Sequence, residues 1–589
     1  MKKKQRTERR GIKKLFGLLG RDRRLLIVSF VLAALYAVTQ ALIPLLMGNA
    51  TTVLADGAND VIGDTGTIDF AKIGQILLTA LIILALNWVF LMLQNRIVIG
   101  ITQHLALNIR TALAEKIGRL PVSYYESRAF GDVLSTVTYD VMILTDGFQN
   151  FFVQLVSAPM YIIALLVIMF RIHWAMALAT LVSLPLSALG ARLVLSRSQK
   201  YYDAYQQGQG ELDGQIEEML TGFQVLKLFR YEKQALERFR KANRELSHSG
   251  EKSLLHSWIL SPVTSFVSNL SYAVVLVLGG YLACIGAISV GHIQSFINYV
   301  NSINEPIQQM ANLGSVLQSV NAASERVFDF LEAEEEPAVE APVAVPAVKG
   351  DVRFDGVRFG YVPEKTIIHH FDLEVKAGSH IAIVGPTGAG KSTLIKLLMR
   401  FYDVNGGAIR VDGQDITRMD RADLHKGLGI VLQETWLFDG TILDNVRLGR
   451  LQATDEEVLD AIRQAGADYF VNTLPGRERF VLHENGGNIS AGQRQLLTIA
   501  RAILADRPIL ILDEATSSVD TQTELRIQEA MDRLMRGRTS FVIAHRLSTI
   551  VNADCILYLE NGDVVEQGTH QELMDRHGAY RRLFDSQFM

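Results

Sequence analysis

The chain has 589 residues, which exceeds the usual size of one domain and predicts two or three. Its formal charge of −4 indicates nothing about a nucleic-acid partner, and Cys284 and Cys555 lie too far apart to suggest a disulfide or metal framework. The 49% of hydrophobic residues are spread unevenly. Long uncharged runs fill residues 1–320, whereas residues 350–589 have the composition of a soluble domain.

The N-terminal 24 residues are strongly basic, with eleven Lys or Arg against two acidic residues. A secretory signal peptide also begins with basic residues. However, no small-residue cleavage site ends a short apolar core here, and further apolar runs follow. We therefore interpret residues 1–24 as a cytoplasmic basic segment.

Long apolar runs follow this segment, and a membrane-spanning helix needs about 20 mostly apolar residues. Uncharged runs of that kind lie at 25–55, 73–95, 147–170, 172–191 and, with length for two spans, 253–304. The segment Gly286–His292 is the expected connection between the last two. The sequence thus predicts six spans in a transmembrane domain of residues 25–332.

The charges beside these runs predict the orientation of the chain. The loop 49–74 is acidic, whereas the N-terminus is basic, so the positive-inside rule places the N-terminus in the cytoplasm. Because the number of spans is even, the C-terminal half returns to the cytoplasm, where ATP is found. A multi-pass protein with both termini cytoplasmic is expected.

Two long polar segments, 98–146 and 192–252, separate spans two from three and four from five. Helical spacing of apolar residues predicts that the spans continue into the cytoplasm as hairpins, with turns near Pro121–Ser127 and Leu228–Gln234. One interpretation is two solvated hairpins. A second is that their tips press on the soluble domain and transmit motion.

The sixth span carries polar residues spaced mostly three or four apart, which places them on one helix face. They are Asn298, Asn301, Glu305, Gln308 and Asn312. Such residues face a cavity or form helix–helix hydrogen bonds, and both roles stay open for the amides. A carboxylate is costlier to bury, so Glu305 is the better candidate for a substrate pathway, with Asn298 and Asn301 beside it. It could equally lie near the cytoplasmic end of the span.

Residues 333–348 are rich in Pro, Glu and Ala and predict a linker, after which a domain of residues 349–589 begins. There, an apolar strand at 380–384 runs into "GPTGAGKST", which fits the phosphate-loop pattern G-x-x-x-x-G-K-[ST]. Backbone N–H groups and the following helix start bind phosphates, Lys391 reaches the β/γ oxygens, and the Ser392 hydroxyl serves Mg²⁺. The candidate residues for ATP are Gly385, Thr387, Gly388, Ala389, Gly390, Lys391, Ser392 and Thr393.

A second motif, "ILILDEATSSVD", has a buried apolar strand that ends in two carboxylates. Side chains at the C-terminal edge of such a sheet lie in the ligand crevice. Asp513 is therefore the candidate for the Mg²⁺ shell, and Glu514 the candidate to polarise an attacking water. Together with the phosphate loop, these residues predict an ATPase.

With these motifs the chain resembles the ABC transporter superfamily, and more closely its exporter-type half-transporters. The resemblance covers nearly the whole sequence and implies a six-span membrane α-helical bundle fused to an α/β P-loop ABC ATPase domain. It also implies roles for four more residues. Tyr361 matches the aromatic that stacks on adenine, Gln433 the glutamine that contacts Mg²⁺ and water, Asp520 the D-loop, and His545 the catalytic switch histidine. "GRLPVSYYESRAFGDVLS" resembles the first coupling-helix region.

The stretch "NISAGQRQLL" matches the family's signature motif, usually LSGGQ. In the family two nucleotide domains enclose two ATP molecules head to tail, so Ser490, Ala491, Gly492 and Gln493 would face the γ-phosphate held by the other subunit. Ala491 replaces the usual glycine, where a methyl group crowds the phosphate and restricts φ. The preceding "RFVLHENGG" also departs from the family pattern.

A deviant signature beside an intact Glu514 favours the subunit of a bacterial heterodimeric multidrug-type exporter that keeps the catalytic Walker B glutamate. A symmetric homodimer is the alternative. The expected function is ATP-driven export of a drug, lipid or peptide across the bacterial plasma membrane, with multidrug export as the family-level expectation. Two further functions stay open: an ATP-gated channel or regulatory subunit, and uptake through an exporter-like fold. A nucleic-acid partner is not expected.

Overall fold

The computed structural model describes residues 22–63, 66–339, 341–343, 348–362, 364–432, 435–513, 520–543 and 550–588. The described residues form two compact units. The helical unit combines the described part of Met1–Gly118 with Phe130–Ala333, and the sheet-containing unit combines Arg119–Ala129 with the described part of Glu334–Met589. A short piece of the N-terminal half, Arg119–Ala129, thus packs with the C-terminal half.

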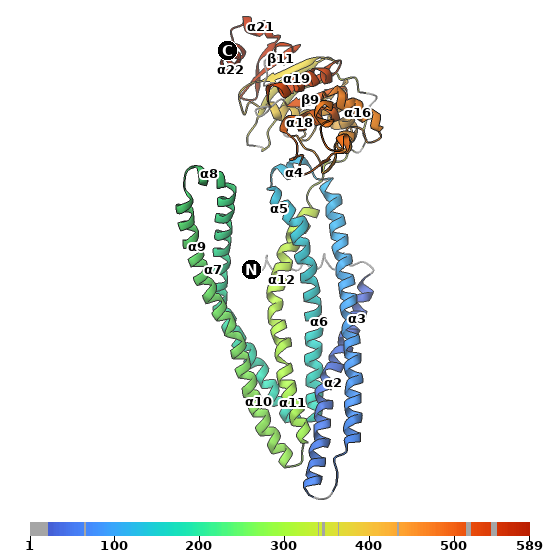
Figure 1. Ribbon diagram of the computed structural model, residues 1–589, viewed down its shortest axis with the longest axis vertical. Coiled ribbons are helices and arrows are strands. Elements are labelled where there is room, and N and C mark those ends of the chain that lie inside the picture. Colours follow the sequence, from blue (N-terminus) through green and yellow to red (C-terminus); the bar gives the residue numbers. More distant parts are fainter. Residues whose placement is uncertain are drawn as a thin grey trace. The chain divides into compact units, whose positions relative to one another are not determined.

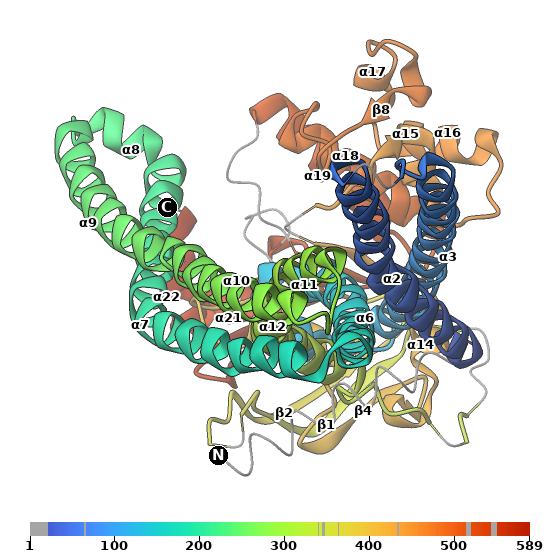
Figure 2. The same ribbon diagram turned by 90° about the horizontal axis from the view of Figure 1, so that it is seen from below.

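Helices, most of them long, build the helical unit (Figure 1). They are α2 (Arg23–Ile62), α3 (Phe70–Ile117), α5 (Phe130–Ser135), the π-helical turn Thr136–Asp140, α6 (Val141–Ile172), α7 (Trp174–Thr221), α8 (Phe223–Leu228), α9 (Glu232–Trp258), α10 (Leu260–Cys284), α11 (Val290–Ser302) and α12 (Asn304–Leu331). Helix α2 packs against α3, α6 and α11, while α7 packs against α9 and α10 (Figure 2).

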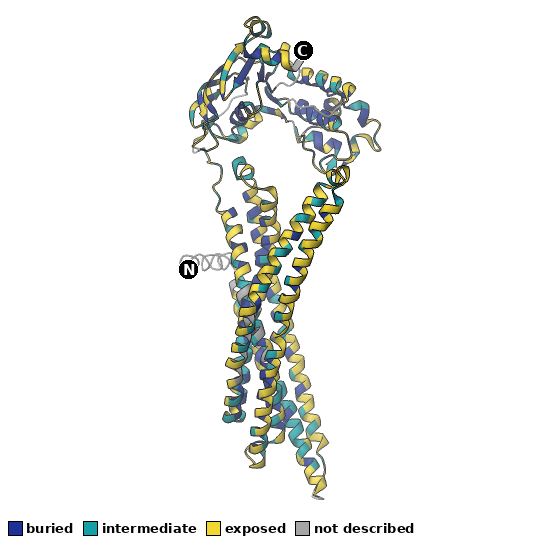
Figure 3. Cartoon of the chain, turned by 90° about the vertical axis from the view of Figure 1, so that its left-hand side faces the viewer, coloured by how far each residue is buried: buried dark blue, intermediate teal, exposed yellow. Residues whose placement is uncertain are grey.

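The helical unit buries narrow stripes and exposes most of its apolar surface (Figure 3). In α3 the buried residues Ala80, Asn87, Gln94 and Ile101 recur every seven positions, so one face meets the bundle. Asn87 and Gln94 form helix–helix hydrogen bonds: Asn87 Nδ2 donates to the Tyr36 carbonyl at 3.1 Å, and Gln94 Nε2 to Ser157 Oγ at 3.0 Å. Apolar side chains that point outward fit a lipid environment.

Helices α2 and α11 approach closely because glycine stands on both. A side-chain carbon built on Gly291 would lie 1.7 Å from the carbonyl oxygen of Gly48. The two backbones can approach this closely only because both residues lack a side chain. Such close packing at glycine is typical of membrane helices.

Four helical segments in the described part of the chain are long and apolar enough to cross a membrane. They are Arg24–Ile62, Phe70–Ile117, Phe130–Ile172 and Glu232–Cys284. They contain the first, second, third and fifth predicted spans. The fourth and sixth spans correspond to the start of α7 and to α11 with the start of α12, and they stay predictions.

The predicted turns are confirmed in position, but the sixth span is not one continuous helix. The chain turns at residues 285–289, between α10 and α11, and at the tips near α4 (Val122–Glu126) and α8. However, α11 ends at Ser302 and α12 begins at Asn304, with Ile303 between them at φ −80° and ψ −18°, and the single polar face expected across this span stays a prediction. Pro306 explains the interruption, because it lacks the N–H of a continuous helix. The side chains of Gln308 and Asn312 lie outside the described residues.

Three sheets form the frame of the other unit. The strands are β1 (Val352–Phe359), β2 (Ile368–Val375), β3 (His380–Val384), β4 (Gly406–Val411), β5 (Gln414–Asp415), β6 (Leu428–Val431), β7 (Gly440–Thr441), β8 (Val481–Leu482), β9 (Ile509–Asp513), β10 (Thr539–Ile543), β11 (Cys555–Glu560) and β12 (Asp563–Gly568). The main sheet has the order β12-β11-β3-β10-β9-β6, the second β2-β1-β4-β5, and the third β7-β8.

Helices surround these sheets. They are α4, α13 (Lys391–Leu398), the 3₁₀ turn Ile416–Arg418, α14 (Arg421–Lys426), α15 (Ile442–Arg447), α16 (Asp455–Gln464), α17 (Asp468–Val471), the 3₁₀ turn Arg477–Arg479, α18 (Ala491–Ala505), α19 (Thr521–Met535), α21 (His570–Asp575) and α22 (Ala579–Phe588).

The main sheet is buried on both faces, which is why its strands are continuous apolar runs. In β9, Ile509 and Ile511 face one hydrophobic cluster, while Leu510 and Leu512 face the other. Strands β3, β10, β9 and β6 pair in parallel, so their C-terminal ends meet at one edge. The strands predicted before the phosphate loop and before Asp513 are confirmed. The phosphate loop and Asp513 therefore lie at the same edge of the sheet.

Candidate functional site

The phosphate loop connects the C-terminal end of β3 to α13. Gly385 has φ 146°, and a side-chain carbon there would lie 2.1 Å from the carbonyl oxygen of Leu559. Gly390 precedes α13 in the left-handed region, with φ 99°, and provides no side-chain cap. The first N–H groups of α13 thus have no capping side chain and are available to an anion.

Lys391, the first residue of α13, folds back over this loop. Its Nζ donates hydrogen bonds to the carbonyl oxygens of Gly385, at 2.7 Å, and Pro386, at 3.0 Å. Burial lowers the pKa of this ammonium, and the nearby Asp513 carboxylate opposes that shift. The loop carbonyls therefore hold the cation at the place where phosphate oxygens are expected.

The remaining loop residues differ in exposure. Ala389 and Thr393 are buried, whereas Thr387, Gly388 and Ser392 are exposed. Burial of Ala389 and Thr393 anchors the loop, and exposure of Ser392 leaves its hydroxyl accessible. The Ser392 hydroxyl is thus accessible in the first turn of α13.

Asp513 ends β9 and is paired with Ile543 of the adjacent strand β10. The next strand, β3, leads directly to the phosphate loop, and Asp513 interacts electrostatically with Lys391. An oxygen donor and a hydroxyl beside a phosphate site fit Mg²⁺, which takes few protein ligands and keeps waters and phosphate oxygens. The described residues contain no group of three His, Cys, Asp or Glu that could hold a metal alone.

Tyr361 lies beside the same helix. Its hydroxyl is 3.3 Å from Thr393 Oγ1, and its ring contacts Phe359 and Tyr402 edge-on, with centroids 5.0 Å and 4.9 Å apart. The side chain is nevertheless 41% exposed. The two neighbouring rings orient Tyr361, while part of its surface stays open for stacking.

Three predicted catalytic residues, Gln433, Glu514 and His545, lie outside the described residues. Their chain neighbours are placed: Asp513 precedes Glu514, and β10 ends two residues before His545. Asp520 accepts a hydrogen bond from Thr523 N at 2.9 Å and caps α19. Its pKa is lowered by these backbone and side-chain hydrogen bonds of Thr523.

The signature motif begins α18. Ser490 is the N-cap, its Oγ accepts from Gln493 N at 3.2 Å, and Gln493 Oε1 accepts from Ser490 N at 3.0 Å. Ala491 is the first helical residue and is exposed, while Gly492 is buried. Because Ala491 is helical, its methyl group strains no backbone here, so the expected restriction of φ has no consequence within this chain. Crowding of a ligand by the exposed methyl group stays a prediction.

The unusual loop before the signature is tied to the segment after Gln433. Glu484, Asn485 and Gly486 are consecutive left-handed residues, with φ of 49°, 58° and 70°. Asn485 Oδ1 accepts from Leu437 N at 2.7 Å, and Asp439 Oδ1 accepts from Glu484 N at 3.0 Å. Asn favours this conformation more than most residues do, which is the signal in the sequence that points to Asn485.

Glu126, at the end of α4, contacts the helix that follows the phosphate loop. Its Oε1 accepts from Lys396 Nζ at 2.8 Å and its Oε2 from the Tyr402 hydroxyl at 2.6 Å. Burial raises the pKa of this carboxyl, but the bonds from Lys396 and Tyr402 outweigh burial and lower it. Burial and the Glu126 carboxylate raise the pKa of Tyr402. The sequence analysis identified the α4 region but missed this contact.

Of the three candidates in the sixth span, Glu305 lines a cavity in the helical unit that Asn298 and Asn301 do not line. Asn298 is half-buried on α11, and Asn301 is exposed near its end. The structure therefore separates Glu305 from the two asparagines. Its cavity neighbours come from three other helices and are described below.

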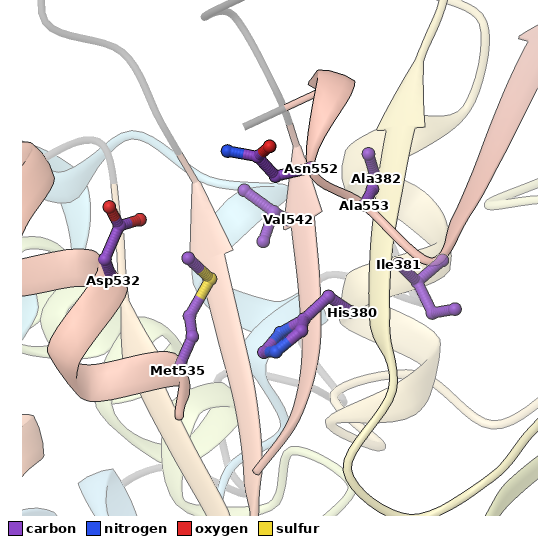
Figure 4. Close-up of a pocket in the computed structure, with 8 residues that line it drawn as sticks. All are labelled: His380, Ile381, Ala382, Asp532, Met535, Val542, Asn552 and Ala553. Atoms are coloured by element: carbon purple, nitrogen blue, oxygen red, sulfur yellow. The ribbon is translucent and has the colours of Figure 1, made fainter. Parts of the chain in front are cut away.

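A further cavity, of about 240 Å³, lies in the sheet-containing unit away from the phosphate loop (Figure 4). His380 lines it and begins β3, five residues before Gly385, which is about 16 Å along a strand. Asp532, Met535 and Asn552 lie around it. Among the predicted site residues that the structure describes, none is a lining residue of this cavity.

Comparisons with known proteins extend over both units. One family model, the ABC transporter transmembrane region, matches residues 26–307, and a second, ABC transporter, matches residues 368–517. The fatty acid ABC transporter ATP-binding/permease protein of Mycobacterium bovis is 42% identical over 535 residues, which are 91% of this chain and 84% of that protein.

Two further proteins are similar along most of the chain. The ATP-dependent lipid A-core flippase of Syntrophus aciditrophicus is 33% identical, over 83% of this chain and 81% of that protein. A solved structure of a bacterial Atm1-family ABC exporter with ATP bound has a TM-score of 0.76 and 27% identity. It covers 96% of this chain and 98% of that one.

Proposed function

Since the chain belongs to the exporters of the ABC transporter superfamily, we propose that it is one half of a dimeric exporter of an amphipathic substrate. It is an ATPase coupled to transport. The relatives are named for fatty acids and for lipid A-core, so a lipid-like substrate is the working assignment. The observation that supports coupling most directly is the contact of Glu126 with Lys396 and Tyr402.

We assign ATP binding to the phosphate loop and its surroundings. Backbone N–H groups from Gly385 to Ser392 bind the phosphates, Lys391 pairs with their oxygens, and the exposed part of Tyr361 stacks on adenine. Mg²⁺ bound with ATP neutralises charge on the phosphates, and the Ser392 hydroxyl, Asp513 and Gln433 are the residues that would hold it.

We assign hydrolysis to residues that follow the central strands. Glu514 accepts a proton from the attacking water or orients it, as its place after the buried strand β9 allows. His545 follows β10 and would face the γ-phosphate, and Gln433 follows β6. Strands β6, β9 and β10 are neighbours in the parallel sheet, which supports grouping the three residues at one edge.

We infer that a second subunit completes each site. Ser490, Gly492 and Gln493 lie at the start of α18, where Ser490 is exposed, and would meet the γ-phosphate bound by the partner's loop. The methyl group of Ala491 projects at this surface and weakens that contact. A heterodimer, in which the partner provides a regular signature, is therefore favoured over a homodimer.

The tip of the second hairpin also supports pairing. We call residues Thr221–Tyr231 the second tip and Arg119–Ala129 the first tip. Large apolar side chains of the second tip are 53–78% exposed: Leu220 next to it, and Phe223, Val225, Leu228 and Phe229 within it. Exposed apolar clusters of this kind mark interaction sites. We assign this surface to the ATPase unit of the partner.

We place the protein in the bacterial plasma membrane with both termini in the cytoplasm. The support is the basic N-terminus, the acidic first loop and the membrane-length helices. In this orientation the two tips lie on the ATP side.

The test is ATP turnover and ATP-dependent transport by the chain in lipid vesicles, alone and with its partner half. Glu514→Gln is expected to bind ATP with near-normal affinity and to lose at least about 100-fold in turnover, because the acid–base contribution is removed. Lys391→Ala is the control, and it should lose binding. Near-normal turnover by Glu514→Gln would reject the assignment of Glu514.

A further inference from the structure

The geometry points to a cavity in the helical unit that binds the ammonium head group of a cationic amphiphile, and that rejects a fatty-acid carboxylate. This inference deepens the proposed export function and rests on it for the direction of transport. Binding itself does not depend on that function. Three observations carry the inference: the position of the cavity, its charge, and the acceptors that line it.

The cavity lies where four helices meet. It has a volume of about 160 Å³ and is lined by Tyr36 and Gln40 of α2, Ser157, Ala158 and Tyr161 of α6, Ser302 of α11, and Glu305, Pro306 and Gln309 of α12. Helix α2 packs on α6 and α11, and α12 packs on α6 and α11. The volume accommodates a head group with its neighbouring carbons, whereas an alkyl tail must extend beyond it.

The depth of the cavity follows from helical rise. Tyr161 lies eleven residues before the end of α6 at Ile172, about 17 Å along the helix. Glu305 lies fifteen residues after the start of α11 at Val290, about 22 Å along the chain. Since the hydrocarbon core is about 30 Å thick, both residues lie within it when the two turns are at the outer surface.

Among the described residues that line the cavity, one side chain is charged, and it is negative. Glu305 is the only ionisable acid or base, apart from two tyrosines, among the nine lining residues. Its Oε1 accepts a hydrogen bond from Gln309 Nε2 at 3.2 Å, which neutralises no charge. The Glu305 side chain is exposed, so it is accessible to a ligand, and within the hydrocarbon core a bound ammonium group would provide its counter-charge.

The remaining polar groups also favour a donor-rich cation. Pro306 cannot donate the helical hydrogen bond that the carbonyl oxygen of Ser302 would otherwise accept. Gln40 and Gln309 add amide oxygens, and Tyr36 and Tyr161 add aromatic rings, whose faces attract ammonium groups. A carboxylate or phosphate would meet no positive side chain among the lining residues and would face Glu305 instead.

The test compares two probes with the same tail, dodecylammonium and dodecanoate, on the protein in lipid nanodiscs. Binding is read as the ligand-induced shift of the unfolding temperature and as stimulation of ATPase activity. We expect saturable effects of dodecylammonium only. Glu305→Gln should raise its half-saturating concentration about tenfold, because one charge pair is lost.

Two more variants sharpen the test. Asn301→Ala, on the same span but outside the cavity, is the matched control and should behave like the wild type. Glu305→Lys should reverse the preference toward dodecanoate. Equal or stronger effects of dodecanoate on the wild type, or an unchanged response of Glu305→Gln to dodecylammonium, would overturn the inference.

The outcomes also separate this inference from the proposed function. Binding of dodecylammonium through Glu305 without ATP-dependent transport would reject export while supporting the cavity assignment. ATP-dependent transport of dodecanoate, unaffected by Glu305→Gln, would support export and reject the cavity assignment.

Discussion

The two polar hairpins between the spans look alike in the sequence, but their tips have opposite chemistry. The first tip is polar at its contact: Glu126 is held by Lys396 and Tyr402 of its own chain. The second tip is apolar, and its Leu228 and Phe229 side chains are 78% and 73% exposed. Beside the second tip, a cavity of about 450 Å³ is lined by residues of α7, α8 and α9.

The arms of the hairpins differ as well. In the first hairpin, an ion pair joins Asp140, in the π-helical turn, to Arg326 of α12, with N–O distances of 2.7 Å and 2.5 Å. In the second, α7 and α9 pack mainly against each other and against α10. This difference is the basis of our proposal that the first tip binds within its own chain and the second tip binds a partner subunit.

The largest effect is expected from charging the second tip. The double substitution Leu228→Asp and Phe229→Asp should reduce partner-dependent ATPase activity and transport at least about 100-fold, since burying two such side chains contributes about 3 kcal/mol or more. Gln234→Asp, an exposed polar site nearby, is the control. Unchanged activity of the double variant with its partner half would show that this surface is not an interface.

A large effect on stability is expected from loss of the ion pair between Asp140 and Arg326 in the first hairpin. Asp140 is 1% exposed, so Asp140→Asn leaves the guanidinium of Arg326 without its counter-charge and should cost about 2 kcal/mol, a value discounted because Arg326 is half exposed. Thermal unfolding in detergent measures the loss. The double variant Asp140→Leu with Arg326→Met should recover most of it, and no recovery would contradict the pair as the cause.

A moderate effect is expected at the first tip itself. Glu126→Gln keeps the shape of the side chain but removes its charge, so the hydrogen bonds with Lys396 and Tyr402 should weaken by about 1 kcal/mol. The equilibrium between the first tip bound to these two residues, which we call the docked tip, and the unbound tip should then shift about fivefold. Substrate-stimulated ATPase activity should fall by that factor, whereas ATP affinity should not change. Glu364→Gln, an exposed acid elsewhere in the ATPase unit, is the control. An equal fall in both variants would contradict a specific role.

The smallest effect is that of pH on the first tip. The pKa of Glu126 is lowered below its ordinary 4.5. Its contribution to the stability of the docked first tip is therefore present above pH 4.5 and is lost as pH falls through the lowered pKa. The pKa of Tyr402 is raised above its ordinary 10.0. Its contribution to the stability of the docked tip is therefore present below pH 10.0 and is lost as pH rises through the raised pKa. Hydrogen exchange of Val122–Glu126 should therefore keep constant protection between about pH 5 and 9 after correction for intrinsic exchange rates. A change in protection centred between about pH 6 and 8 would be inconsistent with these two groups.

The sequence predicts the ATPase unit well because its chemistry depends on backbone geometry. Gly385 and Gly390 are required by positive φ and close contacts, so the phosphate loop is recognisable from the residues alone. The buried strand before Asp513 is equally distinct, since each of its apolar residues faces a core.

The helical unit is predicted less completely because its contacts join residues far apart in the sequence. The run 253–304 gives the turn between α10 and α11, but Pro306 does not by itself tell where α11 ends. The neighbours of Glu305 at Tyr36 and Tyr161 are 269 and 144 positions away, and no local pattern connects them. The partners of Glu126 are likewise distant, at Lys396 and Tyr402.

Site-specific cross-linking in membranes is the most direct test of whether the first tip binds within its own chain and the second tip binds a partner. A cysteine is placed either at Glu126 or at Phe229, after replacement of Cys284 and Cys555 by serine, and is labelled with a benzophenone maleimide. The account predicts that position 126 cross-links within one chain and stays near 65.4 kDa, whereas position 229 yields a species of about twice that mass or, with a different partner half, of the summed mass. A single-chain product at position 229, or a two-chain product at position 126, would contradict it.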